Sequence, residues 1–152
     1  MRLNHDYVRS ILLFIEQETT YKQGTQIPVF HNEIRYTVIL KNKDFEDCDQ
    51  QELAYALELL IKEGFIECSR QPHFNNGNLN LANIIGLTWK GHELLDNIRD
   101  NTIWTAVKQK ASKIGGFSLT ILASTAKDVA NALMSDPNAI QNFMQGIENI
   151  FH

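Results

Sequence analysis

The chain has 152 residues, of which 43% are hydrophobic and 21% charged, as is usual for one globular domain or for a small domain with an appendage. Its net charge of −4 is opposite in sign to that of most nucleic-acid-binding proteins, so any DNA contact requires a local basic patch. No apolar run is long enough to span a bilayer and no signal-peptide pattern opens the chain, so we expect a cytoplasmic protein.

The first predicted elements are a helix and a strand. Asn4 can cap a helix over residues 5–18, in which apolar side chains recur every three or four positions. Glycine and proline then mark a loop, and the alternation of apolar and polar residues over 34–41 predicts a strand. Ile39 breaks that alternation, and a helix over the same residues is the alternative.

A second amphipathic helix is predicted in the middle of the chain. Either Asp47 or Asp49 can cap its start. Gly64 suits its C-terminal end, because glycine readily adopts the left-handed conformation found there.

A polar hairpin is predicted after this helix. Its strands cover residues 65–70 and 83–89, and the run Asn75-Asn76-Gly77-Asn78 between them is a strong turn signal. Thr88 then stands where the N-cap of a further helix is expected.

The rest of the chain is predicted to be helical. The apolar stripe changes phase at residues 100–101, which predicts a kink or a fresh N-cap, and residues 115–116 are a Gly-Gly break. Ser118 can cap a helix that ends at about Met134, and a last helix over residues 137–151 has proline at its first position.

The order helix, strand, helix, hairpin, helix resembles a winged helix, in which the hairpin is the wing. The run Leu87-Thr88-x-x-Gly91-x-x-Leu94-Leu95 is similar to the wing exit of many bacterial winged-helix regulators, where the threonine caps the next helix and the glycine allows close packing. We therefore expect a mainly α fold with a small β-hairpin: a winged helix-turn-helix-like core over residues 1–100 and a C-terminal helical extension over 101–152. The helix that usually precedes the recognition helix has no clear place between Pro28 and Phe45.

A closer resemblance covers nearly the whole chain. The residues that carry it are Leu3-Asn4-His5-Asp6, Gly91-His92-Glu93-Leu94-Leu95-Asp96-Asn97-Ile98-Arg99-Asp100, Trp104, Lys108 and Gly115-Gly116. They resemble an uncharacterised family of small bacterial and prophage proteins, a domain of unknown function. The resemblance implies a bacterial or prophage setting, and it brings no known catalytic residue with it.

Two features of the sequence invite a catalytic or metal-binding interpretation. Cys48 and Cys68 lie twenty residues apart, which fits free thiols in a reducing compartment rather than a disulfide framework or a zinc site. His92 and Asp96 are spaced to share a metal on one helix face, but no third ligand follows at a suitable spacing, which favours a surface role. Because no phosphate loop and no partnered nucleophile occur either, we expect no enzyme, no cofactor and no metal.

The helix before Gly64 would be the recognition helix, and its charge opposes DNA. Residues 44–67 contain eight acidic side chains and one lysine, and phosphates repel acidic groups. A solvated or protein-binding face therefore fits better than insertion into a groove, while the wing is polar and weakly basic. The candidate contacts to DNA or to a partner are Gln51, Tyr55, Glu58, Lys62, Arg70, His73, Asn76 and the lysine cluster Lys108, Lys110 and Lys113.

Two functions from different classes follow from these observations. One is a DNA-binding transcriptional regulator, which the frequency of DNA binding among winged helices favours. The other is a protein-interaction module, such as an adaptor or inhibitor in phage–host conflict, which the acidic recognition helix and the apolar tail favour. A continuous positive band across the wing and the recognition helix would support the first, and its absence would support the second.

The last two predicted helices carry few charges and two broad apolar faces. Faces of that size are typical of interfaces, which predicts a homodimer formed by the tails, with an intramolecular helical hairpin as the alternative. The scarcity of basic residues argues against binding to a membrane surface. The candidate contacts in the dimer are Leu122, Val129, Leu133, Phe143, Met144 and Ile147.

Overall fold

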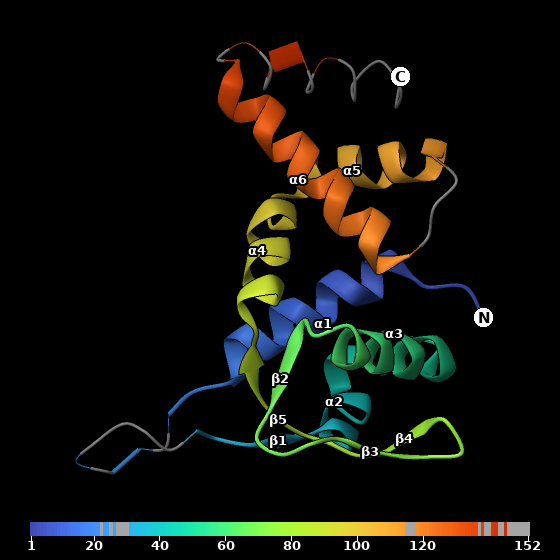
Figure 1. The fold of residues 1–152 in the computed structure, drawn as a ribbon, viewed down its shortest axis with the longest axis vertical. Coiled ribbons are helices and arrows are strands. Elements are labelled where there is room, and N and C mark those ends of the chain that lie inside the picture. The colour runs from blue at the N-terminus through green and yellow to red at the C-terminus, as the bar shows by residue number, and fades with distance from the viewer. Residues whose placement is uncertain are drawn as a thin grey trace. The chain divides into compact units, whose positions relative to one another are not determined.

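The computed structural model describes residues 1–21, 23–24, 26, 31–114, 118–136, 138, 141–142 and 145. The chain divides into two compact units, Met1–His92 and Glu93–His152. The part of the chain that is described is mainly helical, with six α-helices, one short 3-10 helix and two small antiparallel sheets (Figure 1). The expectation of a mainly α fold with a small amount of β structure is confirmed at this level.

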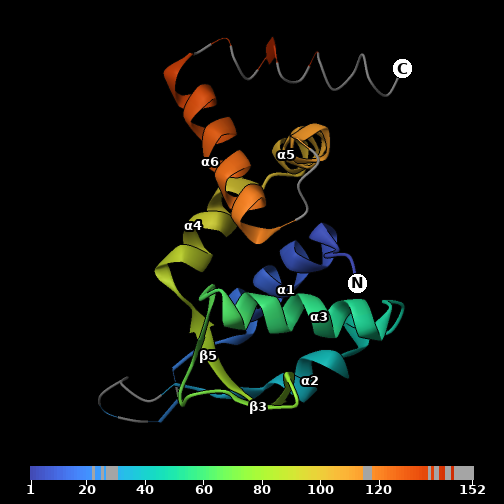
Figure 2. The ribbon, with the colours of Figure 1, turned by 45° about the vertical axis from the view of Figure 1, so that its right-hand side comes forward.

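The first unit alternates helices and short strands. In order these are α1 (His5–Glu18), β1 (Ile34–Arg35), α2 (Tyr36–Leu40), the 3-10 helix η1 (Lys43–Phe45), α3 (Gln50–Lys62), β2 (Ile66–Cys68), β3 (His73–Asn75), β4 (Asn78–Leu81), β5 (Asn83–Leu87) and the start of α4 (Trp89–Ile98). One sheet has the strand order β1-β5-β2, and β3 and β4 form the other. Helix α3 packs against both α1 and α2, as can be followed in Figures 1 and 2.

The strand predicted over residues 34–41 is wrong beyond Arg35. The Tyr36 amide still donates to the Ala82 carbonyl oxygen over 3.1 Å, but the chain then turns into the helix α2. The helical turn buries Ile39 completely and leaves Val38 half exposed to solvent. The helical alternative holds because Tyr36, Ile39 and Leu40 have i, i+3, i+4 spacing, which places them on one helix face. Helix α2 also lies where the sequence left no clear place for a helix, before α3.

The core of the first unit lies between α1, α3 and the inner face of the three-stranded sheet. Full burial of a leucine or isoleucine side chain contributes about 1.5–3 kcal/mol, so these residues dominate the stability of the unit. The fully buried valine, leucine and isoleucine side chains of this unit are Val8, Ile11, Leu12, Ile15, Ile39, Leu53, Leu57, Leu60 and Ile84.

The predicted N-caps of α1 and α3 are confirmed. The Asn4 side chain accepts from the Asp6 and Tyr7 amides at 3.1 and 3.3 Å, and Asp49, not Asp47, accepts from the Glu52 amide at 2.9 Å. The two helix starts are also joined to each other, because the Asp49 amide donates to the Tyr7 hydroxyl and the Asn4 amide group donates to Glu52.

The hairpin predicted after α3 has a more elaborate form than expected. Strands β2 and β5 pair with each other, and the segment between them forms the separate hairpin of β3 and β4. Asn76 and Gly77 turn this hairpin with φ values of 51° and 82°. Two successive positive φ values are the signature of the tight turn for which an Asn-Gly pair is favoured, so the predicted turn is confirmed.

The second unit contains the rest of α4, then α5 (Asn101–Ile114) and α6 (Leu119–Ser135), which pack against each other. Asp100 accepts from the Thr102 and Ile103 amides, so the phase change of the apolar stripe is a fresh N-cap. Ser118 caps α6 as predicted, through a 3.2 Å bond from the Ile121 amide. The predicted break at residues 115–116 and most of the last predicted helix lie outside the described residues. None of the described helices combines the length and apolarity needed to cross a bilayer.

Candidate interaction surface

Thr88 joins the end of α3 to the start of α4. Its hydroxyl donates to the Gly64 carbonyl oxygen over 2.6 Å and accepts from the Gly91 amide over 3.1 Å. The predicted cap is therefore confirmed, and the same hydroxyl also satisfies a carbonyl group at the end of α3. A Cβ atom on Gly91 would overlap the carbonyl oxygen of Phe65, so the close packing expected of this glycine is confirmed too.

Helix α3 presents little of its length to solvent. Residues 52–61 are all buried or half-buried, and the exposed positions of the helix are Gln50, Gln51 and Lys62 at its two ends. Of the four candidate contacts on this helix, Gln51 and Lys62 are exposed, whereas Tyr55 and Glu58 are half-buried. The sequence pattern predicts one buried face for this helix. In the fold more of the helix is covered, because α1, α2 and the β3–β4 hairpin all lie beside it.

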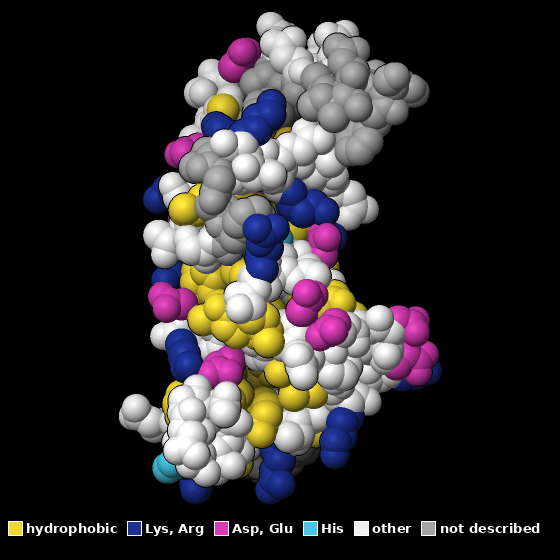
Figure 3. Space-filling view, turned by 90° about the vertical axis from the view of Figure 1, so that its right-hand side faces the viewer, with side chains coloured by type: hydrophobic (Ala, Val, Ile, Leu, Met, Phe, Trp, Pro, Cys, Tyr) yellow, Lys and Arg dark blue, Asp and Glu magenta, His cyan; other side chains and the backbone are white. Residues whose placement is uncertain are grey.

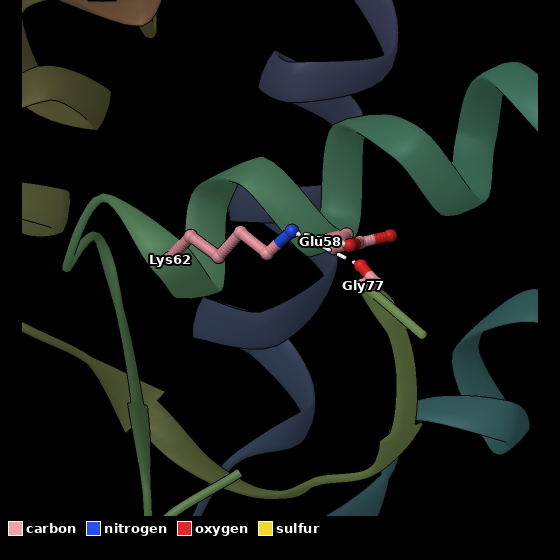
Figure 4. A network of polar contacts seen from close by, with 3 residues as sticks. All are labelled: Glu58, Lys62 and Gly77. Carbon is pink, nitrogen blue, oxygen red and sulfur yellow. Dashed lines mark hydrogen bonds and ion pairs between the residues drawn. The ribbon is translucent and has the colours of Figure 1, made fainter. Parts of the chain in front are cut away.

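Lys62 connects α3 to the hairpin. Its Nζ atom lies 2.6 Å from Glu58 Oε1 and donates to the Gly77 carbonyl oxygen over 3.3 Å (Figure 4). The same nitrogen lies 4.9 Å from the centre of the Phe74 ring, within the range of a cation–π interaction. One lysine therefore contacts its own helix, the tip of the hairpin and an aromatic side chain of β3.

These contacts change what α3 can recognise. A helix that reads DNA needs a row of free side chains that reach base edges in the major groove. Here the lysine of the helix is engaged by the hairpin, and the carboxylate of Glu58 lies beside it with 17% of its side chain exposed. Groove insertion would require the β3–β4 hairpin to move away from α3.

The predicted wing contacts are exposed. Arg70, His73 and Asn76 all have exposed side chains, and Arg70 makes no ion pair with any residue that the structure describes. On the face drawn in Figure 3, basic side chains are interspersed with acidic and uncharged ones.

The lysine cluster lies in the second unit. Lys108 is half-buried, with its Nζ atom 5.4 Å from the centre of the Trp104 ring, while Lys110 and Lys113 are exposed. The proposed contacts of the wing and of this cluster therefore belong to different compact units.

The residues predicted to form a dimer have mixed positions. Leu122 and Val129 are fully buried within a single chain, so a second copy could not reach them without a rearrangement, and Leu133 is half-buried. Phe143, Met144 and Ile147 lie outside the described residues. The homodimer itself stays a prediction.

An exposed tryptophan is the feature that sequence reasoning missed. Trp89, the first residue of α4, has 86% of its surface exposed, which is unusual for so large an apolar side chain. It precedes His92, Glu93 and Asp96 by three, four and seven positions, so it stands on the polar face of its helix. The sequence could have indicated this exposure, because the predicted cap at Thr88 fixes where the helix begins and therefore which residues share a face with Trp89.

The residues considered for metal binding do not gather into a site. Within the described part of the chain no group of three or more histidine, cysteine, aspartate or glutamate side chains could hold an ion. Asp96 forms an ion pair with Arg99 at 3.1 Å. Cys48 and Cys68 are free thiols, both half-buried, as predicted.

The comparisons with known proteins place the chain in an uncharacterised family. Residues 2–118 match the family described as hypothetical protein (DUF2513). An uncharacterized protein of Haemophilus influenzae is 32% identical over 135 residues, which cover 89% of this chain and 97% of that protein. No solved structure matches the chain at a significant level.

Proposed function

We propose that this chain, which belongs to the DUF2513 family of hypothetical proteins, is a non-enzymatic binding protein that recognises another protein. In this proposal the first unit is a winged-helix-type module whose recognition helix is closed off from DNA by the hairpin. The observation that carries the proposal is the attachment of Lys62 to Gly77 and Phe74 across that hairpin.

The order of elements supports a winged-helix-type assignment of the first unit. A helix, a strand, two further helices and a returning pair of strands follow one another, and the late strand β5 lies between β1 and β2. Helix α2 supplies the element before α3 that such an arrangement requires. This likeness concerns architecture, and many functions can use one architecture.

The surface of the first unit supports a protein ligand. Protein interfaces are enriched in tryptophan and other aromatic residues, and a few such side chains supply most of the binding energy. Trp89 is 86% exposed, and on the hairpin Phe74 and Leu81 are 41% and 43% exposed. In the proposal Trp89 is the anchor that a partner buries, and truncating it to alanine weakens binding by about 2 kcal/mol or more.

Photo-cross-linking in the native host tests this proposal. Full-length protein with p-benzoylphenylalanine in place of Trp89 is irradiated in cells, purified under denaturing conditions and analysed by mass spectrometry. The control carries the same group at Gln51, an exposed position at the start of α3. We expect a discrete protein conjugate from position 89 and none of that mass from position 51. Equal conjugates from both positions, or none from position 89, would contradict the proposal.

A second candidate is DNA binding through the wing alone. It is favoured by the exposed Arg70 guanidinium, which no described acidic residue pairs, and by the winged-helix-type order of elements. Such contacts to phosphates would position the protein without reading the sequence. The substitution Arg70→Gln would then weaken binding to every DNA duplex by the same factor. If the protein binds only another protein, the wild type shows no duplex binding in the first place.

A further inference from the structure

The tip of the β3–β4 hairpin carries the one Asn-Gly pair in the sequence. Asn76 and Gly77 are both exposed, and they connect strands that pair through Asn75 and Asn78 on either side. Because Gly77 lies between the strands, its amide nitrogen is outside the ladder of interstrand hydrogen bonds. Solvent therefore reaches both residues of the turn without unfolding of the first unit.

An asparagine followed by glycine can modify itself. The side-chain carbon Cγ of Asn76 is an electrophile, and the backbone nitrogen of the next residue can attack it to close a succinimide ring. A side chain on the next residue hinders this attack, whereas glycine has no Cβ. The Gly77 nitrogen then forms a bond to Cγ as the bond between Cγ and Nδ2 breaks. The leaving nitrogen takes up the proton that Gly77 gives up and departs as ammonia.

Water opens the ring at one of its two carbonyl carbons. Attack at Cγ breaks the new bond and leaves an aspartate in an unchanged backbone. Attack at the backbone carbonyl carbon of Asn76 breaks its bond to Gly77 instead, so the main chain now runs through Cγ as an isoaspartate. Either product carries a new carboxylate, and isoaspartate also adds a methylene group to the backbone. One water molecule is consumed in either case, and no electrons are transferred.

The contact with α3 opposes closure of the ring. Lys62 Nζ donates to the Gly77 carbonyl oxygen over 3.3 Å, and the turn is held at φ values of 51° and 82°. To reach Cγ, the Gly77 nitrogen must rotate about the Cα–C bond of Asn76. The same rotation displaces the Gly77 carbonyl group from Lys62, so the reaction has to break this hydrogen bond.

We propose that Asn76 is a site of spontaneous deamidation and that its isoaspartate product releases the hairpin from α3. A two-residue turn fits the twist of its strands only with the backbone geometry seen here, and an added methylene group destroys that fit. Gly77 and the Phe74 ring then no longer meet Lys62. The inference rests on the Lys62 contacts that the proposed function also uses, but it needs no protein partner.

The hairpin provides internal controls for the rate of modification. Full-length protein is incubated at mildly alkaline pH and physiological temperature, and mass spectrometry of its peptides measures the exchange of –NH₂ for –OH at each asparagine. Asn78 and Asn80 are exposed in the same hairpin, and a leucine follows each. Because only Asn76 precedes a residue without Cβ, we expect it to react about tenfold faster than either, or more.

Two lysine variants test whether α3 restrains the reaction. Lys62→Met should deamidate several-fold faster at Asn76 than the wild type, because the turn is then free to rotate. Lys90→Met should react at the wild-type rate, since Lys90 donates to the Glu63 carbonyl oxygen and does not contact the hairpin. Amide hydrogen exchange in α1, which these lysines do not contact, shows whether each variant is folded.

The effect of the product is measured on the purified isoaspartate form. Ion-exchange chromatography separates the deamidated protein, and Asn76→Asp serves as the control with the same added charge but no added methylene group. Asp-Gly suits this turn as Asn-Gly does. Amide hydrogen exchange over residues 73–81 should therefore be several-fold faster in the isoaspartate form than in Asn76→Asp.

Three results would overturn the proposal. One is deamidation of Asn76 no faster than that of Asn78 and Asn80. Another is an equal rate at Asn76 in Lys62→Met and Lys90→Met, which would show that α3 does not restrain the turn. The third is equal hydrogen exchange over residues 73–81 in the isoaspartate form and in Asn76→Asp, which would show that the hairpin stays on α3.

Discussion

The ammonium nitrogen of Lys62 lies 3.3 Å from the carbonyl oxygen of Gly77, fifteen residues further along the chain. This bond links the C-terminal turn of α3 to the tip of the β3–β4 hairpin. The lysine that the sequence offers for contact with DNA is thus used inside the protein, where Glu58 and the Phe74 ring also engage it. The link depends on an Asn-Gly turn that presents a backbone carbonyl to the helix.

Replacing Lys62 by methionine should loosen the hairpin more than it destabilises the fold. Lys62 keeps 40% of its side chain exposed, so solvent weakens its ion pair with the half-buried Glu58, and we expect a loss in global unfolding free energy below about 1.5 kcal/mol. Amide hydrogen exchange over residues 73–81 should become several-fold faster. Lys90→Met is the matched control, because Lys90 also donates to a backbone carbonyl, that of Glu63, but does not contact the hairpin. Unchanged exchange in Lys62→Met would show that the hairpin is held by other contacts.

Thr88→Ala should destabilise the first unit by about 1–2 kcal/mol. The substitution removes the N-cap of α4 and also leaves the Gly64 carbonyl oxygen without the hydroxyl that donates to it. Thr88→Ser keeps the hydroxyl and should recover most of the loss. Thr105→Ala is a suitable comparison, because that hydroxyl bonds only to a carbonyl within its own helix. Urea unfolding curves of the three variants measure the effect, and equal stability of Thr88→Ala and Thr105→Ala would contradict it.

Gly91→Ala should be more damaging than an alanine at the neighbouring glycine of β5. At position 91 a Cβ atom would overlap the Phe65 carbonyl oxygen and lie 3.2 Å from Leu87 Cβ, so the backbone itself must shift. Overpacking of this kind costs about 1–3 kcal/mol. At Gly86 the nearest atom to an added Cβ is Thr19 Oγ1 at 3.9 Å, so Gly86→Ala should be nearly neutral. Similar melting temperatures for the two variants would disprove the close contact.

The stability of the protein should fall at alkaline pH in a way that depends on Cys68. Burial, and then the negative charge of Glu67, raise the pKa of the Cys68 thiol. The folded protein therefore holds this proton more tightly than the unfolded chain does. The corresponding stability is present below the unfolded pKa of about 8.5 and is lost as the pH rises through the folded value.

The stability of wild type relative to Cys68→Ala, measured with a reducing agent present, should accordingly decrease between about pH 8 and pH 10. A difference that stays constant over this range would show that the thiol titrates equally in both states.

The features that the sequence predicted correctly depend on neighbouring residues. The caps at Asn4, Asp49 and Thr88, the break at Gly64 and the Asn76-Gly77 turn all use side chains or φ values within a few positions of the element that they begin or end. Local hydrogen bonding decides such features, so a single sequence is sufficient to find them.

The features that were missed depend on contacts between distant parts of the chain. Residues 36–40 satisfy both an alternating and a helical pattern, and only the burial of Ile39 against the core decides between them. The half-burial of Tyr55 and Glu58 follows from the fold around α3, whose neighbours the sequence pattern does not identify.

Titration of a fluorescent DNA duplex of mixed sequence tests most directly whether the hairpin keeps α3 from binding DNA. Full-length protein is added up to tens of micromolar at about 50 mM and about 200 mM salt, where phosphate contacts differ most in strength, and anisotropy is recorded for wild type, Gln51→Ala and Lys62→Met. We expect that neither Gln51 nor Lys62 contributes to any saturable binding of the duplex. Saturable binding that weakens steeply with salt and is lost in both variants would show that α3 reads DNA, and would contradict it.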